Sequence, residues 1–114
     1  MVGQIQRTRG KAAYRRAADA AGKKPKNTVL PAITGTPTEG ETLTCSTGTW
    51  TNTPDAYAYQ WLRAGVPIAG ATASTRVLDA ADVGSAMSCT VTATNEGVST
   101  SATSAPTAVV EADE

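Results

Sequence analysis

Residues 28–110 alternate apolar and polar positions in short runs that glycine and proline interrupt. An alternation with a period of two puts one side of each run against a core, which is typical of half-buried β-strands. Seven short strands separated by turn residues favour an all-β fold with a two-sheet β-sandwich. The predicted strands are 29–35, 41–47, 56–63, 66–69, 75–79, 85–94 and 99–110.

Two cysteines and a tryptophan fall inside these predicted strands at a recognisable spacing. Trp61 follows Cys45 by 16 residues, and Cys89 follows Trp61 by 28. In an immunoglobulin-type (Ig-type) sandwich the two cysteines lie on facing strands of opposite sheets, and the indole packs against them. We expect these three residues to form the structural centre of the core. The cysteines could be bonded or reduced, because a free cysteine also packs well as a small core residue.

The charge is divided unevenly along the chain, although the net charge is zero. Residues 1–26 carry eight basic side chains and one acidic side chain, a net charge of +7, whereas residues 27–114 have a net charge of −7. This asymmetry predicts a basic N-terminal docking arm, residues 1–27, attached to an acidic domain, residues 28–110. The last four residues, 111–114, form an acidic tail that we expect to be frayed. The basic residues of the arm are Arg7, Arg9, Lys11, Arg15, Arg16, Lys23, Lys24 and Lys26.

Within the arm, the alanine-rich stretch 11–21 predicts a short α-helix that ends at Gly22, before Pro25. Tyr14 and several alanines would form an apolar stripe along it. A stripe of this kind beside basic side chains favours docking on an acidic protein surface, with Tyr14 as the anchor. Nucleic-acid binding and a solvated tail without a function remain as alternatives.

The composition argues against enzyme chemistry. The chain contains no histidine, which removes histidine-based triads, metal sites and acid–base catalysis. The two cysteines are too far apart in sequence to resemble a metal-binding pair, so no metal or cofactor is expected. Asp79 and Asp82 are interpreted as capping residues of a turn, not as a catalytic carboxylate pair. Trp50 is expected to cover the core.

No apolar run is long enough for a secretory leader or a membrane span. We therefore expect synthesis in the cytoplasm and no membrane partner.

Several motifs resemble bacterial and phage immunoglobulin-like domains over residues 28–110. The resemblance implies an Ig-like fold of the prokaryotic type, since Met87 stands where antibody domains keep a tyrosine two residues before the second cysteine. The motifs are TPTEGETLTC at 36–45, GTW at 48–50, YQWLR at 59–63, IAGAT at 68–72, AADVG at 80–84 and VTATN at 91–95.

A single such domain on a short basic arm is similar to phage virion decoration proteins. The resemblance implies a non-enzymatic structural protein on the capsid surface, whose arm binds the major capsid protein or another shell protein. Copies could also associate with one another on the capsid. The alternatives are a tail, neck or head-fibre component, and a host-surface or carbohydrate-binding adhesin that uses the loops at 50–57 and 95–100.

Overall fold

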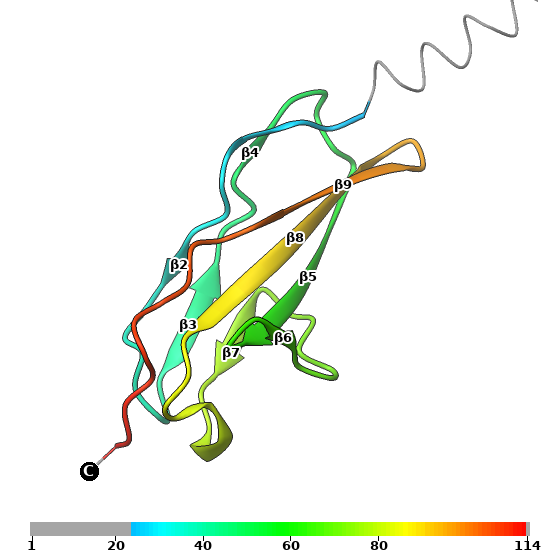
Figure 1. Cartoon of the computed structure of the whole chain (residues 1–114). Helices are drawn as coiled ribbons and strands as arrows, with labels where there is room; N and C mark the ends of the chain where they lie inside the picture. Colours follow the sequence, from blue (N-terminus) through cyan, green and yellow to red (C-terminus); the bar gives the residue numbers. More distant parts are fainter. Residues whose placement is uncertain (1–23, 114) are drawn as a thin grey trace, which may run out of the picture.

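The computed structural model describes residues 24–113, which form nine β-strands and one short 3-10 helix (Figure 1). The predicted helix at 11–21 lies outside the described residues. No helix within residues 24–113 has the length and apolar character needed to cross a bilayer. The elements are β1 (Asn27–Val29), β2 (Ile33–Thr34), β3 (Thr42–Cys45), β4 (Thr49–Trp50), β5 (Ala56–Arg63), β6 (Val66–Pro67), β7 (Thr75–Val77), η1 (Ala80–Asp82), β8 (Met87–Asn95) and β9 (Val98–Thr103).

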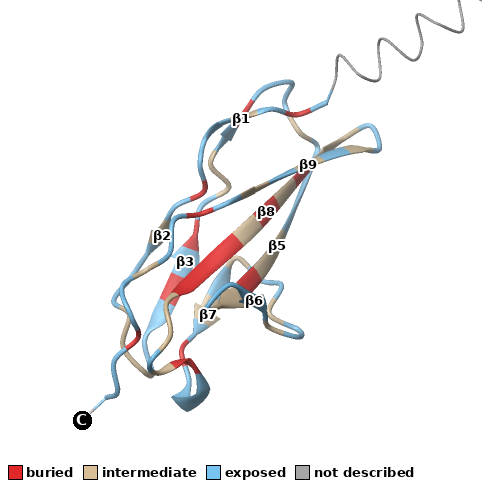
Figure 2. Ribbon diagram, viewed as in Figure 1, coloured by how far each residue is buried: buried red, intermediate tan, exposed pale blue. Residues whose placement is uncertain are grey.

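The strands are arranged in three antiparallel sheets. The largest has four strands in the order β6-β5-β8-β9, a second has the order β2-β3-β7, and β1 pairs with β4. The inward side chains of β3 join those of β5 and β8 in one core cluster, so the three- and four-stranded sheets share a core. Figure 2 shows the buried residues concentrated along β8 and β3. The prediction of an all-β fold is confirmed, and the arrangement is consistent with a β-sandwich.

The core contains few large side chains. It is centred on Trp61, around which aliphatic side chains, Met87 and the two cysteines pack. Trp50 is also buried, as predicted, and its indole Nε1 donates to the Thr47 carbonyl at 2.6 Å. The other buried apolar residues are Leu43, Cys45, Leu78, Met87, Cys89, Val91, Ala93 and Val110.

The first predicted strand, 29–35, is divided between two sheets. β1 pairs with β4, whereas β2 pairs with β3. Pro31 lies between them, and since it has no backbone N–H it cannot continue a ladder. At this point the chain passes very close to Gly48, which has a φ of +74°; a Cβ at Gly48 would meet the Val29 carbonyl oxygen. The single predicted strand is therefore corrected to two, and β4 was not predicted.

The last predicted strand, 99–110, ends at Thr103. Beyond it, side chains replace part of the backbone ladder: the Ser104 hydroxyl accepts from Cys89 N and the Thr107 hydroxyl accepts from Met87 N, both at 3.0 Å. Pro106 cannot donate to a ladder, which explains the early end of the strand. The chain nevertheless stays against the domain as far as Glu111, whose N–H donates to the Pro37 carbonyl at 3.0 Å.

The remaining strands differ from their predicted ranges at their ends, except for 56–63, which is β5 in full. The range 75–79 stops at Val77 because Asp79 caps the 3-10 helix η1. The range 66–69 is reduced to two residues, which follow a tight Ala64–Gly65 turn with positive φ at both positions. The ranges 41–47 and 85–94 become Thr42–Cys45 and Met87–Asn95.

Candidate functional site

The predicted structural centre, Cys45, Trp61 and Cys89, comes together between the two larger sheets. Trp61 on β5 lies directly opposite Cys89 on β8, and Cys45 lies on β3 of the other sheet. All three side chains are buried, and the Trp61 indole Nε1 donates to the Ala73 carbonyl at 2.8 Å. Tyr57, at the start of the same strand β5, is 40% exposed, so the core does not extend to that end of the strand.

The two cysteines are free thiols in the structure. A hydrogen bond with the Cys89 thiol, together with burial, raises the pKa of Cys45 far above its ordinary value. The Cys45 thiol also donates to the Ser46 carbonyl at 3.2 Å. Because the thiolate is the reactive form of cysteine, a buried thiol that stays protonated is suited to packing and not to nucleophilic chemistry.

The base of the arm is part of the folded domain. Pro25 is among the fully buried residues. Lys26 exchanges hydrogen bonds with Thr51, its N–H donating to the Thr51 hydroxyl at 3.0 Å and its carbonyl accepting from Thr51 N at 2.9 Å. Asn52 Nδ2 donates to the Lys24 carbonyl at 2.9 Å. The predicted boundary after Asn27 thus lies beyond residues 24–26, which pack against the domain.

Lys24 and Lys26 are the members of the predicted docking arm that the structure describes, and both are at this packed base. The other predicted docking residues, Arg7, Arg9, Lys11, Tyr14, Arg15, Arg16 and Lys23, lie outside the described residues.

Two loops meet at the end of the domain where Lys24 lies. Asn95 Nδ2 donates to the Asn52 carbonyl at 2.7 Å, and Glu96 N donates to Asp55 Oδ2 at 3.2 Å. We call this region the arm-side end and define it as residues 24–26, 52–55 and 95–97. The two loops considered for ligand binding therefore share one end of the molecule with the base of the arm.

The opposite end contains an ion-pair cluster that sequence reasoning missed. Asp82 was expected to cap a turn, and its Oδ2 does accept from Asp79 N at 3.0 Å. In addition, Arg63 Nη2 lies 2.7 Å from Asp82 Oδ1, and Arg76 Nη2 lies 3.0 Å from Asp82 Oδ2. The Asp82 side chain is fully buried, whereas Arg63 and Arg76 are 30% and 15% exposed.

The environment of Asp82 favours its ionised form. Burial alone would raise the pKa of Asp82, but hydrogen bonds from Asp79 N and from both arginines outweigh burial and lower it. One signal in the sequence could have revealed this cluster. Arg63 and Arg76 are the only basic residues after position 26, and each falls in a predicted strand, where a charged side chain needs a partner.

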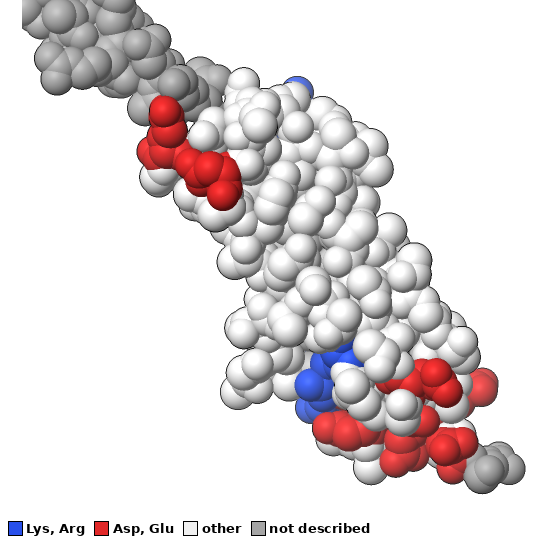
Figure 3. Space-filling view, turned by 180° about the vertical axis from the view of Figure 1, so that it is seen from behind, with Lys and Arg blue, Asp and Glu red and all other residues white. Residues whose placement is uncertain are grey.

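The charged side chains gather at the two ends of the described unit. Figure 3 shows acidic groups next to the arm-side end and at the opposite end, with an uncharged surface between them on the face in view. Residues 24–113 contain four basic and eight acidic side chains, a net charge of −4. The described domain is therefore acidic, in agreement with the charge division of the sequence.

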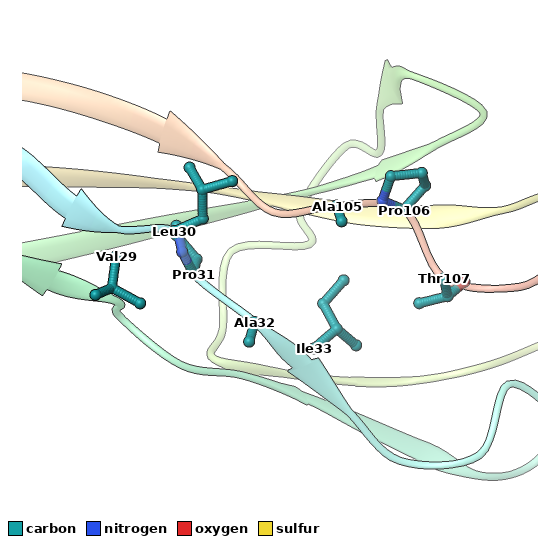
Figure 4. Close-up of a pocket in the computed structure, with 8 residues that line it drawn as sticks. All are labelled: Val29, Leu30, Pro31, Ala32, Ile33, Ala105, Pro106 and Thr107. Atoms are coloured by element: carbon teal, nitrogen blue, oxygen red, sulfur yellow. The ribbon is translucent and has the colours of Figure 1, made fainter.

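An apolar groove lies between the chain that joins β1 to β2 and the chain that follows β9 (Figure 4). Its volume is about 480 Å³. Leu30 and Ile33 line one wall, and Ala105 and Pro106 line the other. Its lining contains no charged side chain, and Thr107 supplies the one side-chain hydroxyl.

Within the described residues, no group of three or more histidine, cysteine, aspartate or glutamate side chains could hold a metal ion. Comparison with known proteins gives no matching family model and no matching curated protein.

Proposed function

We propose that this chain is a non-enzymatic structural component of a phage virion, a decoration subunit with an Ig-like domain. Its basic N-terminal arm anchors the subunit to the capsid shell, and the domain projects outward. The resemblance of residues 28–110 to bacterial and phage Ig-like domains supports the class of protein. The position of the base of the arm, residues 24–26, supports the proposed orientation of the subunit on the shell.

The first and last described residues, Lys24 and Asp113, are at opposite ends of the described unit, which is elongated (Figure 1). A subunit held by the segment before Lys24 would therefore stand on its arm-side end, with η1 and the C-terminus farthest from the shell. This polarity supports display of the domain. The uncharged surface on the face seen in Figure 3 would allow neighbouring subunits to approach one another there without like-charge repulsion.

Anchoring would combine electrostatic steering with the burial of a few side chains. The basic residues of the arm would attract an acidic shell surface and pair with its carboxylates. Tyr14 and the arm alanines would then bury apolar area against the shell. Ordering an arm on docking costs conformational entropy, so the many binding sites of a shell would favour occupancy.

A tail, neck or head-fibre location would use the same arm and remains the second candidate. The adhesin alternative has less support. Trp50 is buried and bonded to Thr47, so it is not available to stack on a sugar. The loops proposed for ligand binding form part of the arm-side end, which an anchored subunit would turn toward the shell and not toward a host.

Deletion of residues 1–23 tests this proposal. The deletion stops before Pro25, because removing that buried residue would damage the domain itself. We expect the shortened protein to remain folded, as judged by circular dichroism and urea unfolding, but to fail to sediment with shell particles that lack the subunit. If the shortened protein sediments with the particles as much as the full chain does, the anchor lies in the domain and the proposal is refuted.

A further inference from the structure

Strand β9 forms one edge of the four-stranded sheet and pairs with β8 alone. The turn before it, Glu96–Gly97, has positive φ at both residues and closes a two-residue hairpin between Asn95 and Val98. β1 lies near β9, but no hydrogen bond joins their backbones in the described part of the chain.

The register decides which backbone groups of β9 face away from the sheet. In an antiparallel pair, residues alternate between those that exchange hydrogen bonds with their partner and those that do not. Ser104 N donates to the Cys89 carbonyl, so the even-numbered residues 98, 100 and 102 bond to β8. The backbone N–H and C=O groups of Ser99, Ser101 and Thr103 therefore point outward, where residues 24–113 supply no partner for them.

The side chains agree with this alternation. The hydroxyl pairs Thr90–Thr103, Thr92–Ser101 and Thr94–Ser99 are 2.7–2.8 Å apart on the outer face of the sheet. Such short separations are typical of the non-hydrogen-bonded pairs, whose side chains lie closest together. These bonds also hold the hydroxyls in a row and leave the outward backbone groups unobstructed by them.

β9 lacks the short length, the charge and the proline found at two other strand edges in the described chain. Proteins commonly protect an edge by making it short or by placing a charge, a proline or a bulge on it. β6 has two residues and includes Pro67, and β7 has three residues and includes Arg76. β9 has six residues, without a charged side chain or a proline. An edge of this kind is a template for strand pairing.

We propose that the β9 edge pairs with the β9 edge of a second copy of this chain, antiparallel and about a two-fold axis at Ser101. The outward residues are symmetric about Ser101, so Ser101 would face Ser101 of the other copy and Ser99 would face Thr103. Each of these three pairs could exchange two backbone hydrogen bonds. β9 is uncharged, so the two-fold axis brings no like charges together on it.

A second copy can occupy this edge in one defined register. The two-fold arrangement satisfies every outward group of the strand with an identical partner, which is the requirement for a self-complementary dimer contact. It would join two four-stranded sheets into one continuous sheet. Since a single strand pair is a small interface, the contact should be weak in dilute solution and should increase where copies are concentrated.

Site-specific cross-linking of the full chain tests the register. In Ser101→Cys, the Cα atoms of the two introduced cysteines would lie about 5.5 Å apart. Their thiols would be within reach of a short bismaleimide. In the control Ser99→Cys, the thiols of the two copies would be offset by four residues along the strand, about 14 Å, and out of its reach. The native Cys45 and Cys89 are buried, so the unmodified chain measures the background.

We expect a covalent dimer from Ser101→Cys and none above background from Ser99→Cys. A mixture of Ser99→Cys with Thr103→Cys should give the mixed dimer. Equal cross-linking of Ser101→Cys and Ser99→Cys would show association through another surface, the arm included, and would overturn the proposal. Absence of the Ser101→Cys dimer at high protein concentration would do the same and would leave an unrelated peptide as the partner of this edge.

Hydrogen exchange of the unmodified chain gives a readout that does not depend on the folding of a variant. The amides of Ser99, Ser101 and Thr103 should become more protected as the protein concentration rises. Protection that does not change with concentration would refute the pairing.

Discussion

Trp61 and Cys89 lie directly opposite each other on β5 and β8, although 28 residues separate them in the sequence. Cys45 approaches the same core cluster from β3 in the other sheet. The indole is fully buried and is the largest fully buried side chain of the described core, so it fills much of the space between the two sheets. The stability of the domain should therefore depend strongly on this one residue.

Trp61→Ala should lower the free energy of unfolding by about 3–5 kcal/mol, a large share of the stability of a small domain. Urea unfolding followed by circular dichroism measures the change. The matched control is Tyr57→Ala on the same strand, which should cost much less because Tyr57 is 40% exposed. Equal costs for the two substitutions would contradict the described core.

Gly48 provides a separate test of the way the chain passes from β1 to β2. Gly48 and Gly70 have nearly equal φ values, +74° and +76°, but a Cβ at Gly48 would collide with the backbone of Val29, whereas a Cβ at Gly70 meets nothing within 4 Å. Gly70→Ala should lower the free energy of unfolding by about 1–2 kcal/mol, because alanine is strained in the left-handed conformation. Gly48→Ala should cost clearly more in the same urea unfolding experiment. Similar losses would mean that the backbones at Gly48 and Val29 do not approach as described.

The sequence pattern was sufficient for the all-β class and for β5, where an uninterrupted alternation has one interpretation. It failed where tertiary contacts decide the local structure. The division of the first predicted strand depends on the close approach of Gly48 to Val29, and the early end of β9 depends on hydroxyls of Ser104 and Thr107 that replace ladder bonds. Neither contact has a local signature in the sequence.

The same limit applies to the site. The capping role of Asp82 follows from a turn pattern, but its two arginine partners lie 19 and 6 residues earlier and meet it only in the folded chain. Likewise, the composition of the arm marks it as a unit, whereas the burial of Pro25 comes from contacts with the domain. Charge division could be predicted from the sequence, but the position of the boundary could not.

The Asp82 cluster should make stability depend on pH. Its pKa is lower in the folded protein than in the unfolded chain, so the cluster contributes stability above the ordinary aspartate pKa of about 3.9. That contribution should be lost as the pH falls below this value and through the folded pKa. Asp82→Asn should cost about 3 kcal/mol at pH 7, and the difference from the wild-type protein should shrink in acid. Urea unfolding at a series of pH values measures both effects.

Asp79→Asn is the control for this prediction. Asp79 is 61% exposed and lies 3.6 Å from Arg76, so its ion pair should contribute less than about 1 kcal/mol. Asparagine also retains an oxygen that can accept the capping bond from Ala81 N. If the pH dependence of stability disappears in Asp79→Asn and persists in Asp82→Asn, then Asp79 causes it, and the prediction for Asp82 is wrong.

The arm should behave as a protein-binding segment and not as a nucleic-acid-binding one. Tyr14→Ala should weaken binding to shell particles by about 2 kcal/mol, as expected for an interface anchor. Arg7→Ala should cost less, and mainly at low salt, because exposed charges are screened. Particle-binding isotherms at two salt concentrations measure both. A larger loss from Arg7→Ala, or tight binding of the arm peptide to DNA at physiological salt, would favour nucleic acid as the partner.

Cryo-electron microscopy of intact virions tests the proposed function most directly. Particles assembled with the full chain should show elongated density on the capsid surface, absent from particles without the protein, into which residues 24–113 fit with Lys24 toward the shell and Asp113 away from it. Density confined to the tail or neck, or fitted with the C-terminal end against the shell, would contradict capsid decoration through the N-terminal arm.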